Sequence, residues 1–296
     1  MTPPNPFADS GETDASDREL LARIRDGSRE ALEELVRRHQ GWIYNIALRM
    51  VYLPQDAEDV TQEVLVKVLT KISTFEARSS VRTWLYRITA NHVLNMKRRR
   101  LEEVGWTFER YAAGVGGAPE LDLPDPGSVP VDVQLLVDEV RIGCSSGMLL
   151  CLDREQRLVY ILGAIFGVSD AVGAELLEVS RDGFRQKLAR ARRDLHSFMH
   201  QQCGLINTAN PCRCAKKTQA FMRAGYIDPD NLVFARAHLA RVREVAPLVN
   251  ERLEDLDAAY AAIHRDHPFH RAPDFVAAVR ALVDQPAFQS ILGRRQ

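Results

Sequence analysis

Residues 56–68 read DAEDVTQEVLVKV, and residues 83–100 read TWLYRITANHVLNMKRRR. The spacing of apolar residues in both stretches predicts helices, but the first is acidic and the second is basic. No acidic side chain occurs from Arg78 to Arg100. A basic surface suits nucleic acid, whereas an acidic surface suits a basic protein surface. The two stretches together therefore indicate a protein with two kinds of partner.

Bulk composition sets only broad limits. The chain has 296 residues, enough for two or three domains, each with its own core. A hydrophobic content of 46% and a charged content of 27% are those of an ordinary globular protein. The net charge of −1 and pI of about 6.7 do not indicate a nucleic-acid-binding protein. The case for nucleic acid therefore rests on the local asymmetry of charge.

The compartment is inferred from the N-terminus and the cysteines. Residues 1–16 are rich in Pro, Asp, Ser and Thr and lack the basic and apolar regions of a secretory signal. We expect this segment to be disordered. Five cysteines, an odd number, argue for a reducing cytoplasm rather than a disulfide framework. No apolar run approaches the length of a membrane span.

We expect an all-α protein, because almost every periodic stretch has helical spacing and no convincing alternating strand is found. Residues 105–130 are rich in Gly, Pro and acidic residues, which predicts a flexible linker, or alternatively a surface loop of one domain. The expected organisation is a disordered segment 1–16, a helical bundle 17–104, the linker 105–130, a helix-turn-helix domain 131–199 and a cysteine-containing helical extension 200–296.

The acidic helix, predicted to start near Asp56 after a break at Pro54, has two distinct faces. Its apolar residues share one side, and Asp59, Gln62 and Glu63 share another, at positions i, i+3 and i+4. Asp56 lies in the first turn, where negative charge suits the helix dipole. Spacing alone leaves a solvated acidic face as the simpler interpretation.

The basic helix, predicted to run through Arg100, is apolar on several sides, so it is expected to pack between other helices. Arg87, Asn91, Asn95 and Arg98 fall in one stripe at roughly helical spacing. Arginine attracts phosphates without reading sequence, and asparagine can pair with a base edge. A solvated helix end is the alternative for the cations 97–100.

A helix, a short turn and a longer basic helix follow from residue 152 to residue 195, which are the parts of a helix-turn-helix. In the last helix the apolar positions 184, 188, 191 and 195 form one stripe, and Ser180 is the candidate N-cap. Arg181, Arg185 and Gln186 are the candidate base or backbone contacts. The candidate phosphate contacts are Lys187, Arg190 and Arg193. An ordinary basic surface helix is the alternative.

The extension begins with a candidate metal site. His200, Cys203, Cys212 and Cys214 could supply four ligands to zinc, although the C-x8-C-x-C spacing is not that of paired C-x-x-C knuckles. Reduced thiols without a role, or a redox pair, are the alternatives.

These blocks carry a resemblance. DAEDVTQEV, TWLYRITAN and NxKRRR resemble region 2 of bacterial extracytoplasmic-function (ECF) sigma factors of the sigma-70 superfamily, from about residue 17 to residue 100. LDREQRLVY, AELLEVS and QKLARARRDL resemble region 4, which reads the −35 promoter element. Gly163, Gly173 and Gly183 depart from that pattern, because helix-forming residues are more usual at these positions. Glycine costs up to about 1 kcal/mol relative to alanine in a helix, so we expect region 4 to be less rigid.

The resemblance implies the function of a sigma factor that binds core RNA polymerase, recognises the −10 and −35 elements and initiates transcription. It implies that the clamp helices of the polymerase contact Asp56, Asp59, Gln62 and Glu63. It also implies that the −10 strand, including a flipped base held by the loop before the basic helix, contacts Arg78, Ser80, Arg87, Asn91, Asn95 and Arg98.

Other expectations follow from the same resemblance. Some ECF sigma factors carry metal-sensing cysteine-rich tails, and the extension resembles these only faintly. Residues 226–296 could form a regulatory domain that packs on regions 2 or 4, replacing or assisting a separate anti-sigma factor. A helix-turn-helix regulator that works without polymerase is the alternative function, but it leaves the acidic helix unexplained. The sequence motifs of common enzyme classes are absent, so we do not expect an enzyme.

Overall fold

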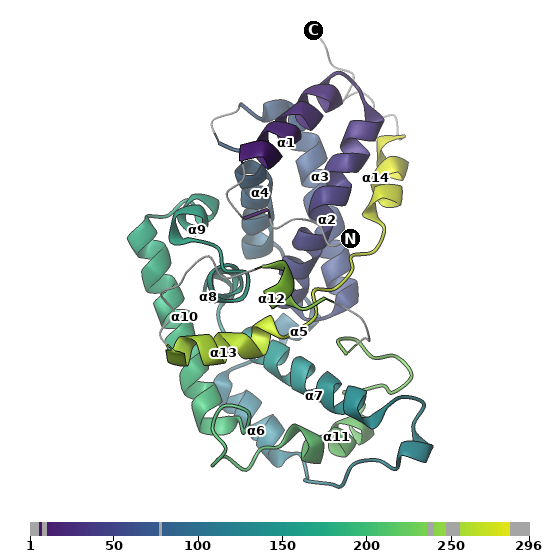
Figure 1. Cartoon of the computed structure of the whole chain (residues 1–296), viewed down its shortest axis with the longest axis vertical. Coiled ribbons are helices and arrows are strands. Elements are labelled where there is room, and N and C mark those ends of the chain that lie inside the picture. The colour runs from purple at the N-terminus through teal and green to yellow at the C-terminus, as the bar shows by residue number, and fades with distance from the viewer. Residues whose placement is uncertain (1–5, 8–10, 77–78, 236–239, 247–254, 285–296) are drawn as a thin grey trace. The chain divides into compact units, whose positions relative to one another are not determined.

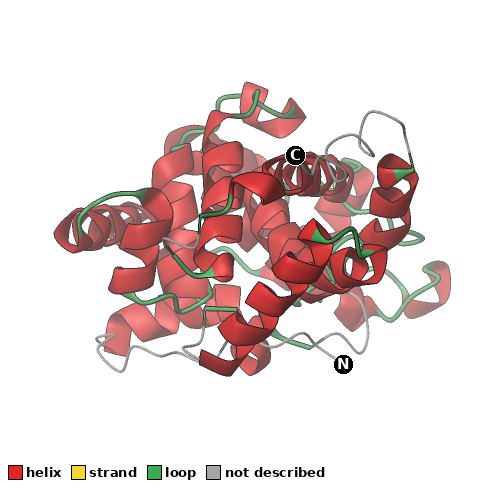
Figure 2. Cartoon of the chain, turned by 90° about the horizontal axis from the view of Figure 1, so that it is seen from above, coloured by secondary structure: helices red, strands yellow, loops and turns green. Residues whose placement is uncertain are grey.

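The computed structural model describes residues 6–7, 11–76, 79–235, 240–246 and 255–284, and the regular elements in these ranges are helices (Figure 2). One isolated antiparallel bridge, between Arg241 and Pro268, is the only β pairing in the same ranges. The expected all-α fold is confirmed. The chain forms two compact units that alternate along the sequence. The first comprises Met1–Lys97, Val168–Phe184 and His270–Gln296, and the second comprises Arg98–Gly167 and Arg185–Phe269.

Four successive helices form the main part of the first unit (Figure 1). They are α1 (Gly11–Arg25), α2 (Arg29–Val51), α3 (Pro54–Lys71) and α4 (Val81–Asn95), with a short 3₁₀ turn at Ile72–Thr74 after α3. Helix α2 is central, because every residue from Gly41 to Val51 is buried. A helix that is buried on all sides needs neighbours on all sides, and α1, α3 and α4 each pack against it.

Two later segments complete the first unit. Helix α9 (Asp170–Leu177) packs against α4, and helix α14 (Phe275–Val283) packs against α2. The entry to α14 is fixed by the buried side chain of Asn45. Its Nδ2 donates to the carbonyl oxygen of His270 (2.7 Å), and its Oδ1 accepts from the backbone N–H of His270 (3.0 Å). The last part of the C-terminal extension, from His270 to α14, thus packs against the N-terminal bundle.

The second unit buries large side chains such as Tyr160 and Phe166. A separate small cluster consists of Leu136, Val140 and Ile227, with Phe221 and Leu232 packed against them. Short 3₁₀ turns lie at Pro126–Ser128 and Leu149–Cys151, and a π-helical turn lies at Ile161–Ile165. The helices are α5 (Arg100–Glu103), α6 (Phe108–Gly117), α7 (Val133–Met148), α8 (Arg154–Tyr160), α10 (Arg181–Gln202) from residue 185 onward, α11 (Cys214–Arg223), α12 (Val242–Val245) and α13 (Asp255–Arg265).

Two buried carboxylates hold the second unit together. Glu102 accepts hydrogen bonds from Arg154 Nη2 (2.8 Å) and Arg157 Nη1 (3.0 Å). Glu139 accepts from the backbone N–H groups of residues 233, 234 and 235, at 2.8 Å, 2.9 Å and 2.5 Å respectively. Burying a charge is costly unless other groups compensate it: Glu102 is paired with two arginines, whereas Glu139 is hydrogen-bonded to three backbone N–H groups.

The structure corrects the predicted N-terminus and linker. Helix α1 begins at Gly11, so the predicted disorder of residues 1–16 is wrong at its C-terminal end. There the Asp14 carboxylate accepts from the Val81 backbone N–H (3.0 Å). The predicted linker 105–130 contains helix α6, whose Tyr111 donates to the Cys144 carbonyl oxygen (2.7 Å). Composition missed α6, because aromatic contacts such as Phe108 with Phe198, whose ring centroids are 4.9 Å apart, fix a segment rich in glycine.

The ends of two helices also differ from the prediction. Helix α3 starts at Pro54, because proline suits the first position of a helix, rather than near Asp56. The sequence predicts a basic helix that runs through Arg100, but α4 ends at Asn95. The next residue, Met96, has an extended backbone conformation (φ −63°, ψ 159°). The four successive cations that follow would repel one another along a continued helix.

The Glu102 cluster gives the first prediction. Glu102→Gln should lower the free energy of unfolding by about 3–5 kcal/mol, because it leaves the buried charge of Arg157 without its anion. Urea unfolding of the full chain measures the loss. The matched control is the neighbouring, exposed Glu103→Gln, with a change within about 0.5 kcal/mol. Equal stability of the two variants would contradict the role of Glu102.

The same cluster sets the sign of a pH effect. Burial alone would raise the pKa of Glu102, but the hydrogen bond from Arg154 and the charge of Arg157 outweigh it and hold the pKa below its ordinary value. A carboxyl group with a lowered pKa contributes stability above its unfolded-state pKa and loses it as pH falls through the folded-state value. The stability difference between the wild type and Glu102→Gln should therefore shrink in acid.

Candidate nucleic-acid and polymerase interfaces

Helix α3 presents the predicted acidic face to solvent. Val60, Val64 and Val68 are buried in the bundle, whereas Asp59, Gln62 and Glu63 are exposed. The amphipathic spacing of the sequence therefore places the side chains as predicted. The fourth residue predicted for this face, Asp56, is only half-buried and lies in the first turn.

Glu63 links the acidic face to α4. Its carboxylate lies 2.9 Å from Nε2 of His92, whose Nδ1 is 2.7 Å from Nζ of Lys67. His92 is buried, so this ion pair fixes the relative position of the two helices at that point. The acidic face is therefore carried on a rigid helix pair.

Ser80, which is predicted to contact DNA, has a structural role at the start of α4. Oγ of Ser80 accepts from the backbone N–H of Thr83 (3.0 Å), which makes Ser80 the N-cap of the helix. Arg78, also predicted to contact the −10 strand, lies outside the described residues. Trp84 packs edge-on against Phe75, with ring centroids 5.5 Å apart, so this ring is involved in packing.

The predicted stripe on α4 is only partly formed. Asn91 and Asn95 are exposed one turn apart, and Nδ2 of Asn95 donates to the Asn91 carbonyl oxygen (2.9 Å). Arg87 is on the same helix, but its guanidinium is hydrogen-bonded to the backbone of α9. Arg98 is not on the helix, because α4 ends at Asn95. The structure thus brings together three of the four residues predicted for the stripe.

The helix-turn-helix forms as the sequence predicts. Ser169 caps α9, and Oγ of Ser180 accepts from the backbone N–H of Gly183 (3.0 Å) at the start of α10. The turn between the helices contains Glu178 in the left-handed region (φ 56°). On α10, Phe184, Ala191 and Leu195 are buried, and Leu188 is half-buried. Arg185, Gln186 and Arg190 are exposed on the other side of the helix.

Three other residues of α10 that are predicted to contact DNA form ion pairs within the chain. Arg181 pairs with Asp170 (2.8 Å), Lys187 with Glu155 (2.8 Å) and Arg193 with its neighbour Asp194 (3.6 Å). Exposed ion pairs are worth about 0–1 kcal/mol, so a phosphate can replace these carboxylates at small cost. The three side chains therefore remain suitable phosphate contacts.

Close packing explains the glycines that depart from the family pattern. A Cβ atom on Gly173 would lie 2.4 Å from the ring of Phe184, and one on Gly163 would lie 2.7 Å from Leu188. Both glycines sit where a helix approaches α10 closely. A Cβ atom on Gly183 would lie 3.1 Å from Oγ of Ser180 and 3.8 Å from Cβ of Val179, which is a looser contact. Gly163 and Gly173 therefore allow tight packing, and the loss of rigidity that the sequence suggested does not follow.

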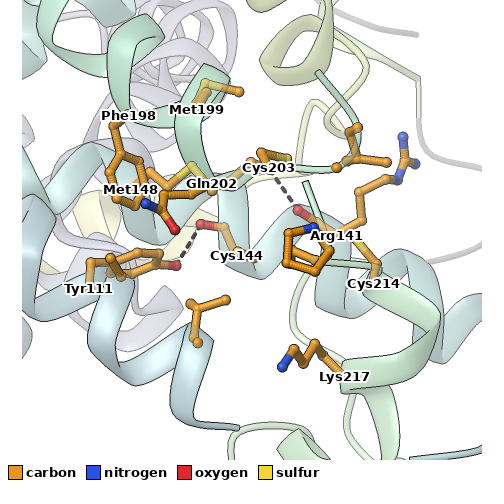
Figure 3. A pocket seen from close by; sticks show the side chains of 18 of the residues that line it. Tyr111, Arg141, Cys144, Met148, Phe198, Met199, Gln202, Cys203, Cys214 and Lys217 are labelled. Atoms are coloured by element: carbon orange, nitrogen blue, oxygen red, sulfur yellow. Dashed lines mark hydrogen bonds between the residues drawn. The ribbon is translucent and has the colours of Figure 1, made fainter. Parts of the chain in front are cut away.

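Four of the five cysteines line one cavity of about 160 Å³ in the second unit (Figure 3). They are Cys144 on α7, Cys203 just after α10, and Cys212 and Cys214 at the start of α11. The spacing of cysteines in the tail could not reveal Cys144, because it lies almost 60 residues earlier in the chain. Burial raises the pKa of Cys212, and it raises the pKa of Cys214 to about 12, so both thiols are protonated near neutral pH.

The predicted metal ligands are not assembled around a common centre. His200 is directed to Tyr260, whose hydroxyl lies 3.2 Å from its Nδ1, and it does not line the cavity. In the part of the chain that the structure describes, no group of three His, Cys, Asp or Glu side chains could hold a metal ion. Zinc binding at His200, Cys203, Cys212 and Cys214 therefore stays a prediction.

Comparison with known proteins identifies the class. The sigma-70 region 2 family model matches residues 35–102, which cover most of α2 and all of α3 and α4. An ECF RNA polymerase sigma factor, SigE of Mycolicibacterium smegmatis, is 29% identical over 203 residues, which is 65% of this chain and 73% of SigE. CnrH, a sigma factor of Cupriavidus metallidurans, is 29% identical over 187 residues, which is 62% of this chain and 94% of CnrH.

Structural similarity is weaker. The crystallographic complex of CnrH with the cytosolic domain of CnrY contains a chain that is 24% identical, with a TM-score of 0.43, covering 62% of this chain and 97% of that chain. Residues 35–102 therefore match sigma-70 region 2, and the chain is similar to extracytoplasmic-function RNA polymerase sigma factors over about two thirds of its length. The curated relatives that it matches are named RNA polymerase sigma factors, which supports a role in transcription initiation. None of the helices described is long and apolar enough to cross a membrane.

The packing at the glycines gives the second prediction. Gly173→Ala should lower the free energy of unfolding by about 1–3 kcal/mol, because the new methyl group overlaps the buried ring of Phe184. The control is Gly114→Ala within α6, where the methyl group meets nothing within 4 Å. It should raise stability by up to about 1 kcal/mol, through helix propensity. Thermal unfolding compares them, and a Gly173→Ala protein as stable as the wild type would refute the close approach.

Proposed function

We propose that this sigma factor binds core RNA polymerase through the acidic face of α3, contacts the −10 strand through α4 and reads the −35 element through α10. The observation that carries the proposal is the exposed set Asp59, Gln62 and Glu63 on a helix whose other side is buried. A charged face on a rigid helix can dock on a basic surface without reorganising, which keeps the entropic cost of binding low.

Helix α4 supplies the chemistry for the −10 strand. Asn91 and Asn95 are exposed amides, which can donate to and accept from base edges. They lie on the helix that follows the loop before Ser80, so one continuous surface of loop and helix can hold an unstacked base. We propose that this surface binds the separated strand, and that substitution of Asn91 reduces open-complex formation more than core binding.

Helix α10 supplies the chemistry for the duplex. Arg185 and Gln186 are exposed in its first two turns, the part of a recognition helix that enters the major groove. Arg181, Lys187, Arg190 and Arg193 flank them as cations for phosphates. The proposed partners are thus core polymerase and promoter DNA. An anti-sigma partner stays a prediction, which is supported by the relative CnrH having been solved with the cytosolic domain of CnrY.

A charge reversal tests the polymerase contact. Asp59→Arg should weaken the affinity for core RNA polymerase by about tenfold, or roughly 1.4 kcal/mol, because a cation then faces a basic partner surface. The matched control is Glu19→Arg, an exposed residue of α1 with the same change in charge. Fluorescence titration with core enzyme measures both. Equal affinities for the two variants would refute the role of α3.

A second substitution tests the duplex contact. Arg185→Ala should cost about 1–3 kcal/mol of promoter affinity and relax specificity at one base pair of the −35 element, if the guanidinium reads a base. The measurement compares holoenzyme binding to a set of promoters that differ at single −35 positions. A loss that is uniform across the set would make Arg185 a phosphate contact.

A further inference from the structure

One buried histidine joins α4 to the acidic face of α3 within the first unit. His92 follows the exposed Asn91 on α4, and only 5% of its side chain is exposed. Its imidazole contacts two side chains of α3 that lie one helical turn apart. Nε2 is 2.9 Å from the carboxylate of Glu63, and Nδ1 is 2.7 Å from Nζ of Lys67.

The chemistry of these groups places the ring proton. An ammonium group carries only donors, so Nδ1 of His92 accepts from Lys67. The proton of the ring then lies on Nε2, the nitrogen beside the carboxylate of Glu63. The imidazole therefore offers a lone pair to the cation and an N–H group to the anion, and it contacts both at once.

The sequence gives the cation and the anion a strong reason to meet directly. Glu63 and Lys67 are four residues apart on one helix with the acid first, which is the spacing and the order at which glutamate and lysine attract each other. In the structure the ammonium group of Lys67 is directed to His92 instead. The carboxylate of Glu63 is 47% exposed, and a carboxylate has further acceptor positions for a partner.

The position of Lys67 makes this arrangement important for docking. Asp59, Glu63 and Lys67 follow one another at intervals of four residues, so they form one row along α3. A cation at the end of this row is next to the face that we assign to polymerase. If it paired with Glu63, it would neutralise part of the negative charge that a basic partner surface needs.

We propose that His92 is a positioning residue for polymerase binding: it holds the ammonium group of Lys67, so that Glu63 stays available to the basic surface of the partner. The inference rests on the proposed function of α3. The core enzyme then meets an acidic side chain that is oriented from behind by a buried ring, rather than one that is already paired with a cation of its own helix.

The test removes the ring and then the cation. His92→Leu keeps an apolar side chain of similar size but removes both ring nitrogens. Lys67 should then pair with Glu63, and the affinity of the full chain for core RNA polymerase should fall about two- to fivefold, because docking must break this exposed ion pair. His92→Leu/Lys67→Gln removes the competing cation and should restore the affinity of the wild type. Fluorescence titration with core enzyme measures each variant.

Three controls separate positioning from packing and from general charge. Lys71→Gln removes an exposed cation one turn further along α3 and should restore little in the His92→Leu background. Lys67→Gln should raise the affinity more in that background than in the wild type, since the two side chains act together. His92→Gln retains an acceptor and a donor, so its affinity should stay within about twofold of the wild type.

A nuclear magnetic resonance measurement on the wild type tests the geometry independently of any folding defect. A long-range ¹H–¹⁵N spectrum of the imidazole groups should show His92 with its proton on Nε2, and the signal is assigned by its loss in His92→Gln. A ring protonated on Nδ1, an unchanged affinity of His92→Leu, or a loss that Lys67→Gln does not restore would overturn the proposal.

Failure of the proposed function would look different. Asp59→Arg would then bind core enzyme as well as Glu19→Arg does, and no variant of His92 or Lys67 would change the affinity. If Asp59→Arg weakens binding and His92→Leu does not, the polymerase contact of α3 stands and only the role of His92 is refuted.

Discussion

The burial of α2 is the constraint on which the first unit depends. From Gly41 to Val51 this helix has no exposed side, so it cannot exist without helices all around it. Helices α1, α3 and α4 supply part of that cover, and α14 supplies another part from the far end of the chain. The buried Asn45 side chain is satisfied there by its hydrogen bonds with His270. Helix α14, at the end of the C-terminal extension, is therefore a structural component of the N-terminal bundle.

The same constraint leaves particular faces available for function. Helix α3 uses its valines to cover α2, and the acidic side chains at the intervening positions necessarily point outward. Helix α4 is buried on most of its circumference, so only a narrow stripe remains for a ligand. Half of that stripe is in contact with α9. The surfaces proposed for polymerase and for DNA thus follow from the need to bury one central helix.

Local periodicity explains what the sequence could predict. The all-α fold, the acidic face of α3, the buried stripe of α10 and the Ser180 cap depend on residues a few positions apart, and each agrees with the structure. The boundaries of the helices were predicted less accurately than their faces. Pro54 suits the first turn of a helix as well as a break, and the run of cations after Asn95 suits a helix end as well as a helix interior. Each of these two signals is compatible with two different helix boundaries, and the local sequence alone does not decide between them.

Contacts between distant segments could not be predicted from one sequence. Nothing near Cys203 indicates that Cys144 shares its cavity, and nothing near Arg87 indicates that the end of α9 caps it. The sequence predicts a linker where the structure has α6, because the glycines of this segment indicate flexibility. Phe108 and Tyr111 anchor the helix through aromatic contacts that composition does not reveal. The most direct test of the sigma-factor account is transcription by core RNA polymerase with this chain as its only sigma factor, on a template library of genomic fragments. The account predicts discrete start sites that share −10 and −35 sequences. Transcription no greater than that of core enzyme alone, although the chain and the core enzyme form an intact complex, would contradict it.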